Sequence, residues 1–271
     1  MSDAVVSAEW LAARLDEVAV VDVRDAWEFD GIGHVPGAVN IPFDAFRAGE
    51  HDEGAGETGM LPGGDVFAAI LGEAGIDRGD EIVAYDDMHG VFAARFLVTA
   101  ELYGHDPAKL HLLDGDFSAW QRERETTSEP ADVAATTYAV ADPREIETPL
   151  VDADDVAAAV DDPDAVIVDT REPEEYADGH VPGAVQLDWR ELVDDETRGL
   201  KPRAEIEAIL DDRGITREKR VVLYCNTARR ISHTYTVLRY LGYEDVGFYE
   251  GSLTEWEREG RPLATGEDES A

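Results

Sequence analysis

Cysteine and lysine are almost absent from this chain. Its 271 residues include one cysteine, Cys225, and lysine occurs only at Lys109, Lys201 and Lys219. A single cysteine excludes an internal disulfide framework. Basic residues number 23 against 61 acidic ones, which gives a formal net charge of −38. So negative a chain is a poor partner for nucleic acid or for an anionic membrane.

Long apolar runs are also missing. No run approaches the roughly 20 residues that span a bilayer. The first residues, MSDAVVSAEWLAARLDEV, lack the basic start and apolar core of a secretory signal peptide. We therefore expect a soluble, cytoplasmic protein. Because molar salt shortens the Debye length to about 3 Å, we interpret the acidity as adaptation to the salt-rich cytoplasm of a halophilic microbe. An acidic interaction surface in an ordinary cell is the alternative.

The chain contains an internal repeat. Residues 20–39 read VVDVRDAWEFDGIGHVPGAV, and residues 167–185 read IVDTREPEEYADGHVPGAV. Downstream, residues 82–120 begin IVAYDDMHGVFAARF and end LLDGDFSAW, while residues 221–256 begin VVLYCNTARRISHTY and end FYEGSLTEW. Both halves are therefore built to one plan.

Each half alternates short apolar runs with helical patterns. The runs AVVDV, VIVDT, EIVAY, RVVLY, KLHLLD and VGFYEG suit buried parallel strands. Between them, RFLVTAELYG and SHTYTVLRYLGY have helical spacing and end at glycine. The pattern predicts an α/β fold of two tandem domains, each a mainly parallel sheet flanked by helices.

The domain boundaries follow from the repeat. We expect an N-terminal domain over residues 1–125 and a C-terminal domain over residues 150–271. The segment 126–149 is rich in threonine, alanine, proline and acidic residues and has little periodicity. It is therefore predicted to be the inter-domain linker.

Cys225 is the strongest candidate for chemistry. It follows the VVLY strand, and the next helix is expected to start near Ile231. Ligands of α/β sheets bind at the carboxyl ends of strands, where loop N–H groups and a helix N-terminus favour an anion. Arg229 and Arg230 add positive charge, and this environment favours a nucleophilic thiolate. The competing interpretation is a small buried core residue.

These motifs resemble the two-domain rhodanese (sulfurtransferase) family. The resemblance rests on the tandem D-x-R…H-V-P-G-A units, each followed by a strand–loop–helix segment, and it covers nearly the whole chain. In that family the C-terminal domain carries the catalytic cysteine and the N-terminal domain is an inactive copy. Asp86 occupies the position that matches Cys225, and a carboxylate cannot carry a sulfane sulfur. The resemblance therefore implies that only the second domain catalyses.

The resemblance also implies a ping-pong transfer. The Cys225 thiolate takes sulfur from a small anionic donor such as thiosulfate, and cyanide or a thiol accepts it from the persulfide. The implied substrate-binding residues comprise the persulfide loop, the arginines that hold the anionic donor and a cleft arginine from D-T-R: Asn226, Thr227, Ala228, Arg229, Arg230 and Arg171. Thr227 would donate to the sulfur. Arg171 has an equally weighted structural interpretation, as a partner for nearby carboxylates.

Other motif residues are expected to be structural. Asp22 and Asp169 would fix the turns after their strands, and His34 and His180 would make structural hydrogen bonds. Trp120 and Trp256 are expected in the core. The histidines show no metal-ligand spacing and there is no phosphate-binding glycine motif, so we expect no metal and no cofactor. We also expect a monomer.

Several alternatives stay open at this point. Rhodanese-like phosphatases and arsenate reductases use C-x5-R spacing, whereas the arginine here comes one residue early. A disulfide reductase would need a second cysteine. A non-catalytic sulfur carrier would take up sulfur on Cys225 without turnover. Among donors, 3-mercaptopyruvate is the alternative to thiosulfate, but its enzymes typically have a loop of the C-G-S-G-V-T type, and the charged C-N-T-A-R-R loop favours thiosulfate.

Overall fold

The computed structural model describes residues 3–49 and 59–266. Its contacts divide the chain into two compact units: residues 2–148 with 195–199, and residues 149–194 with 200–271. The outer ends of the two expected domains, residues 1–2 and 267–271, lie outside the described residues.

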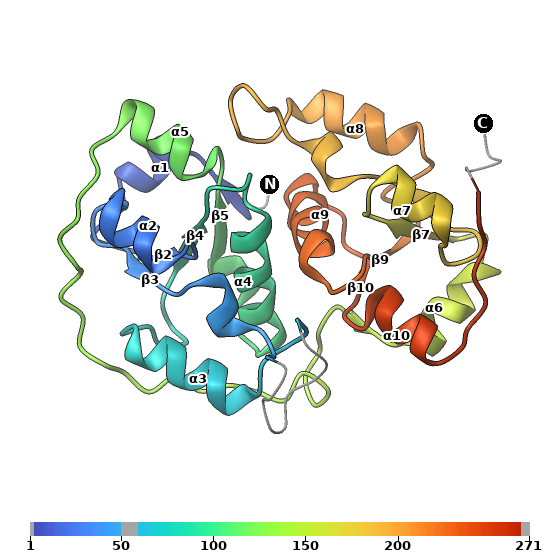
Figure 1. The fold of residues 1–271 in the computed structure, drawn as a ribbon, viewed down its shortest axis with the longest axis horizontal. Coiled ribbons are helices and arrows are strands. Elements are labelled where there is room, and N and C mark those ends of the chain that lie inside the picture. Colours follow the sequence, from blue (N-terminus) through green and yellow to red (C-terminus); the bar gives the residue numbers. More distant parts are fainter. Residues whose placement is uncertain (1–2, 50–58, 267–271) are drawn as a thin grey trace. The chain divides into compact units, whose positions relative to one another are not determined.

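The first unit alternates strands and helices (Figure 1). Its strands are β1 (Val5–Val6), β2 (Ala19–Asp22), β3 (Val39–Asn40), β4 (Ile82–Tyr85) and β5 (Leu110–Leu113). Its α-helices are α1 (Ala8–Ala12), α2 (Ala26–Gly31), α3 (Gly64–Glu73), α4 (Val91–Leu102) and α5 (Asp116–Glu123), and its 3-10 helices are η1 (Phe43–Phe46) and η2 (Pro107–Lys109).

The first sheet has the strand order β1-β5-β4-β2-β3, and every pairing is parallel. One apolar core joins a face of this sheet to α3 and α4, and a second joins the opposite face to α1, α2 and α5. Trp120 is buried in the second core, as expected. The unit is therefore a three-layer α/β/α domain.

The second unit repeats this order. Its strands are β6 (Leu150–Val151), β7 (Ala165–Asp169), β8 (Val185–Gln186), β9 (Arg220–Tyr224) and β10 (Val246–Tyr249). Its α-helices are α6 (Ala153–Val160), α7 (Pro173–Asp178), α8 (Arg203–Asp211), α9 (Arg229–Leu241) and α10 (Ser252–Arg258), and its 3-10 helix is η3 (Trp189–Leu192).

The second sheet has the order β6-β10-β9-β7-β8, again all parallel, and it matches the first sheet strand for strand. A core that includes Trp256 joins one face to α6, α7 and α10. Helix α9 packs on β9 and β10, with Tyr235 edge-on to Phe248. The predicted fold class, two tandem domains with parallel sheets and flanking helices, is confirmed.

The segment predicted as the inter-domain linker, residues 126–149, makes contacts with the first unit. His34 and Thr127 form an antiparallel bridge, and Tyr138 is buried in the first core with its hydroxyl 2.8 Å from Nδ1 of His105. The division between the two units accordingly falls at residues 148–149. Within residues 3–49 and 59–266, no helix is long and apolar enough to cross a membrane.

Candidate active site

Cys225 lies at the carboxyl end of β9, the central strand of the second sheet. Its side chain is buried, with 1% of the residue exposed. The backbone N–H of Cys225 donates to Oγ of Ser252, and its carbonyl oxygen accepts from the N–H of Leu253 at 3.0 Å. The first turn of α10, which follows β10, therefore holds the backbone that carries the thiol.

The loop after Cys225 is short and tightly folded. Ala228 has a positive φ of 60° and is fully buried, and helix α9 begins at Arg229, two residues before the expected start near Ile231. A non-glycine residue in this region of backbone space is uncommon and points to a tertiary constraint. Three residues, Asn226 to Ala228, thus separate the thiol from the helix N-terminus.

Arg230 lies in the first turn of α9 and pairs with Glu175 of α7. Its Nη1 donates to Oε2 of Glu175, and its Nη2 lies 3.2 Å from Oε1. Burial opposes the charged form of Arg230, but the hydrogen bonds and charge of the Glu175 carboxylate outweigh that effect, so the pKa of Arg230 is raised. The arginine is therefore a fixed cation in the first turn of the helix that follows the thiol.

The other predicted loop residues lie where the sequence placed them. Arg229 opens α9, and Arg229, Asn226 and Thr227 are all half-buried. Nδ2 of Asn226 donates to Oε1 of Glu175 at 2.8 Å. Glu175 thus brings Asn226 and Arg230 together at the loop that follows Cys225. The hydrogen bond from Thr227 to the sulfur and the contact of Arg229 with substrate stay predictions.

Arg171 is buried at the end of β7, where its guanidinium group is hydrogen-bonded on two sides. Its Nε donates to Oδ1 of Asp169 at 2.9 Å, and its Nη2 donates to the carbonyl oxygen of Gly179 at 2.6 Å. Arg24 makes the same bonds to Asp22 and Gly33 in the first unit. Because the same bonds occur in both units, they support the structural interpretation of Arg171 and of both aspartates. A contact between Arg171 and substrate stays a prediction.

His34 and His180 make the structural contacts expected of them. His180 stacks on Tyr176 with ring centroids 3.7 Å apart, and its Nδ1 lies 2.8 Å from the carbonyl oxygen of the same residue. His34 stacks on Phe29 at 3.6 Å in the same way. Both histidines therefore hold the turn after their helix.

Asp86 occupies the matching position at the end of β4 in the first unit. Its carboxylate is fully buried and accepts backbone N–H bonds of 2.7–2.9 Å from Met88, Gly90, Phe92 and Ala93. Four residues, Asp87 to Gly90, separate Asp86 from α4, one more than in the Cys225 loop. The loop and the first turn of α4 thus direct four N–H groups at the two carboxylate oxygens.

A basic side chain does lie near this degenerate site. Arg198, which belongs to the first unit by its contacts, donates from Nε to Oδ1 of Asp116 at 2.9 Å and from Nη2 to the carbonyl oxygen of Asp87. Burial raises the pKa of Asp116, and Arg198 opposes that rise. Arg198 therefore already pairs with two carboxylates of the first unit, those of Asp87 and Asp116.

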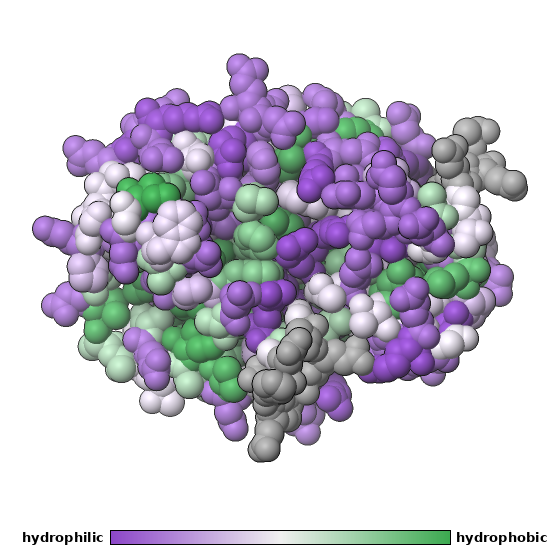
Figure 2. Space-filling view, viewed as in Figure 1, coloured by the Kyte–Doolittle hydropathy of each residue, from purple (hydrophilic) through white to green (hydrophobic). Residues whose placement is uncertain are grey.

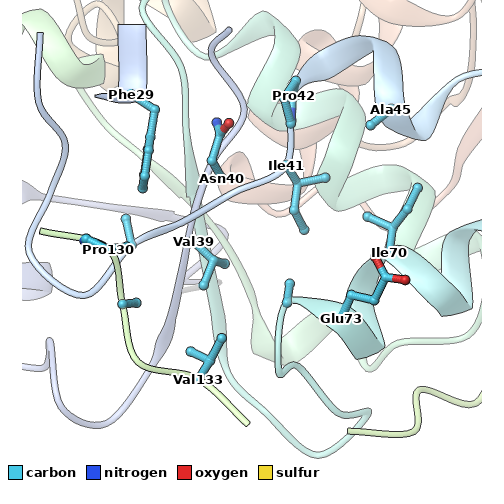
Figure 3. A pocket seen from close by; sticks show the side chains of 13 residues that line it. Phe29, Val39, Asn40, Ile41, Pro42, Ala45, Ile70, Glu73, Pro130 and Val133 are labelled. Atoms are coloured by element: carbon cyan, nitrogen blue, oxygen red, sulfur yellow. The ribbon is translucent and has the colours of Figure 1, made fainter. Parts of the chain in front are cut away.

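The first unit also contains a cavity of about 400 Å³, shown in Figure 3. Among the described residues that line it, Asn40 and Glu73 are the polar side chains, and the rest are apolar or proline, such as Ile41, Ile70 and Val133. The described part of this lining includes neither a thiol nor a basic side chain. The cavity is separate from the residues predicted to react.

Two site residues were not predicted from the sequence. Ser252 accepts a hydrogen bond from the Cys225 backbone N–H, and Glu175 accepts hydrogen bonds from the side chains of Asn226 and Arg230. One signal for Glu175 was available, because two arginines in the first turn of a helix oppose the helix dipole and call for a nearby anion. The sequence did not say which of many carboxylates supplies it.

Comparison with known proteins gives one family. Residues 7–123 and 152–259 match the rhodanese-like domain. A thiosulfate sulfurtransferase of Corynebacterium glutamicum is 31% identical over 285 residues, which cover 97% of this chain and 91% of the relative. A thiosulfate sulfurtransferase of Pseudomonas aeruginosa is 33% identical over 263 residues, with 91% of each chain covered.

A solved structure gives the same picture. SseA from Escherichia coli, described as a 3-mercaptopyruvate sulfotransferase, aligns with a TM-score of 0.77 at 26% identity. The alignment covers 92% of this chain and 98% of that one. The relatives thus carry the names of both donors considered from the sequence.

Proposed function

This chain belongs to the rhodanese-like domain family, and on that premise we propose that it is a sulfurtransferase whose Cys225 carries sulfur from thiosulfate to cyanide or a thiol. The observation that carries the proposal is the position of the single cysteine. Cys225 is buried at the carboxyl end of β9, before the N-terminus of α9, whose first turn carries Arg230. The counterpart in the first unit is a carboxylate that cannot carry sulfur.

The reaction proceeds in two displacements. The Cys225 thiolate attacks the outer sulfur of thiosulfate, the S–S bond of the donor breaks, and sulfite leaves with the bonding electron pair. The new cysteine persulfide is an anion, and backbone N–H groups of the loop and of the first turn of α9 stabilise it. Cyanide then attacks the terminal sulfur, thiocyanate leaves, and the thiolate is restored.

The donor is the finer part of the proposal. The arginines in C-N-T-A-R-R suit the dianion thiosulfate, and this favours thiosulfate sulfurtransferase activity. The likeness to SseA favours 3-mercaptopyruvate as the second candidate. In molar potassium chloride with cyanide as acceptor, we expect a higher kcat/KM for thiosulfate than for 3-mercaptopyruvate. The reverse order would assign the chain to the second activity.

A phosphatase is the outcome that would contradict both activities. The loop that follows Cys225 has three residues before α9, and Arg230 comes at C-x4-R spacing. We expect no hydrolysis of p-nitrophenyl phosphate above background. Turnover of that compound would replace the sulfur chemistry with phosphate chemistry.

The cellular environment of the protein is proposed from its net charge. Hydrophilic side chains cover much of the face shown in Figure 2, and the net charge is −38. We propose that the protein works as a monomer in a salt-rich cytoplasm, where ions screen this charge.

A further inference from the structure

Glu175 joins two residues on opposite sides of the reactive loop. Asn226 directly follows the thiol and donates to Oε1 of Glu175 at 2.8 Å, while Arg230 in α9 donates to both carboxylate oxygens. The Arg230 side chain is 16% exposed and that of Glu175 is 31% exposed. The pair is therefore partly shielded from water, which strengthens it relative to a surface ion pair.

Helix capping alone does not require these bonds. Glu175 closes a capping box by accepting from the backbone N–H of Glu172 at 3.2 Å, and Glu28 does the same for Asp25 in the first unit at the same distance. The loop after Asp86, with the sequence D-M-H-G, offers Glu28 neither an asparagine nor an arginine. The bonds from Asn226 and Arg230 to Glu175 are thus additional to its capping role.

The carboxylate also competes with any anionic donor. Arg230 is a cation in the first turn of the helix that follows Cys225, and Glu175 neutralises its charge in the resting protein. A donor that approaches the thiol must share Arg230 with this carboxylate. A dianion is repelled by Glu175 more than a monoanion is.

We propose that Glu175 is a positioning and specificity-determining residue, which fixes the Cys225 loop through Asn226 and Arg230 and makes donor binding depend on donor charge. The inference rests on the proposed sulfur transfer. It gives Glu175 a second effect on the same reaction, because the carboxylate also weakens the hold of the site on the dianionic product sulfite.

Two substitutions at Glu175 separate the effect of its charge from the effect of its side-chain length. Glu175→Gln keeps the side-chain length and one acceptor oxygen but removes the charge. We expect KM for thiosulfate to fall roughly three- to tenfold, the size of effect of a partly exposed charge pair. KM for the monoanion 3-mercaptopyruvate falls less, and sulfite inhibits more strongly. Glu175→Asp keeps the charge but cannot reach both partners, so kcat falls while KM for thiosulfate does not.

Glu28→Gln is the matched control. It removes the equivalent capping-box carboxylate from the first unit, so a change in helix capping alone would appear in this variant as well. We expect its melting temperature to fall less than that of Glu175→Gln, which also loses the charge pair with Arg230, and its KM to stay unchanged for both donors. The inference is overturned if Glu175→Gln leaves KM for thiosulfate unchanged or raised, or shifts both donors by the same factor.

A binding measurement keeps this inference distinct from the proposed function. In a Cys225→Ser background, calorimetric titration with thiosulfate reports anion affinity without turnover. Adding Glu175→Gln should tighten thiosulfate binding, and equal or weaker binding would overturn the role of Glu175. Absence of thiocyanate formation by the wild-type protein with either donor would instead overturn the transfer reaction, while this titration stays readable.

Discussion

The backbone N–H of Cys225 donates to the hydroxyl oxygen of Ser252 at 3.2 Å, although the two residues are 27 positions apart in sequence. The same hydroxyl donates to the carbonyl oxygen of Tyr249 at 2.9 Å. Ser252 is fully buried and has a positive φ of 49°. The turn from the end of β10 to the start of α10 therefore fixes the backbone position of Cys225.

Ser252→Ala tests this support. Alanine keeps the same backbone requirement but leaves the Cys225 N–H and the Tyr249 carbonyl without their partner. An unmet buried polar group costs about 1–3 kcal/mol, so we expect a comparable loss in the free energy of unfolding and a lower kcat. Urea unfolding and thiocyanate assays measure both. Unchanged values in both assays would show that the hydroxyl supports nothing.

Cys225→Ser tests the nucleophile. Serine is close in size to cysteine, so the buried site should fold unchanged, but its hydroxyl is not ionised at neutral pH and does not form a persulfide. We expect transfer to fall at least about a thousandfold, with no change in circular dichroism. The assay is thiocyanate formation from thiosulfate and cyanide. Activity above a trace would assign the reaction to another group.

Asp86→Asn tests whether the first unit takes part in the transfer reaction. The amide can accept from only two of the four N–H groups and turns its own N–H bonds toward the others. We expect the first unit to lose about 1–3 kcal/mol of stability, while the folded protein keeps its kcat. Thermal unfolding and transfer assays at a temperature below the transition measure this. Loss of transfer in the folded variant would implicate Asp86 in the chemistry.

Glu175 makes stability depend on pH in a defined window. Burial alone would raise the pKa of Glu175, but bonds from Arg230, from the Glu172 backbone and from Asn226 lower it below its usual value of 4.5. A lowered pKa gives stability that is present above the unfolded pKa and lost as pH falls through the folded one. The difference in unfolding free energy between the wild type and Glu175→Gln should therefore be constant above about pH 5 and shrink below it.

Denaturant unfolding of both proteins across that range measures the difference. The comparison removes the effect of all other carboxylates, since the two chains share them. A difference that stays constant to about pH 3 would mean that the Glu175 charge is not stabilising.

Salt should raise the stability of the whole protein. Between about 0.1 and 1 M salt the Debye length falls from roughly 10 Å to 3 Å, which screens the self-repulsion of a chain with a net charge of −38. We expect the melting temperature to rise by at least about 5 °C over this range of potassium chloride. A melting temperature independent of salt would contradict adaptation to a salt-rich cell.

The inner strands and the position of the thiol were predictable from sequence. Central parallel strands such as β4 and β9 are buried on both faces, so they read as continuous apolar runs. Each run is also seen twice because of the repeat. The edge strands β1, β3, β6 and β8 escaped prediction because two residues carry no periodicity.

The details of the site depended on tertiary contacts. The start of α9 was misjudged by two residues because Ala228, which is not a typical capping residue, takes the left-handed cap position. Ser252 and Glu175 were missed because their partners lie 27 and about 50 residues away and no local pattern marks such pairs. Tyr138 shows the same limit, because nothing in its polar surroundings predicts its burial.

The extra residue in the loop after Asp86 makes it hard for the first half to gain the chemistry proposed for the second. A single codon change from aspartate to cysteine would leave a loop whose N–H groups converge on the positions of two oxygens, with no arginine in it. Such a gain would need a substitution, a deletion and a new cation together. The first half can therefore diverge in sequence without readily becoming a second, competing source of persulfide in the same molecule.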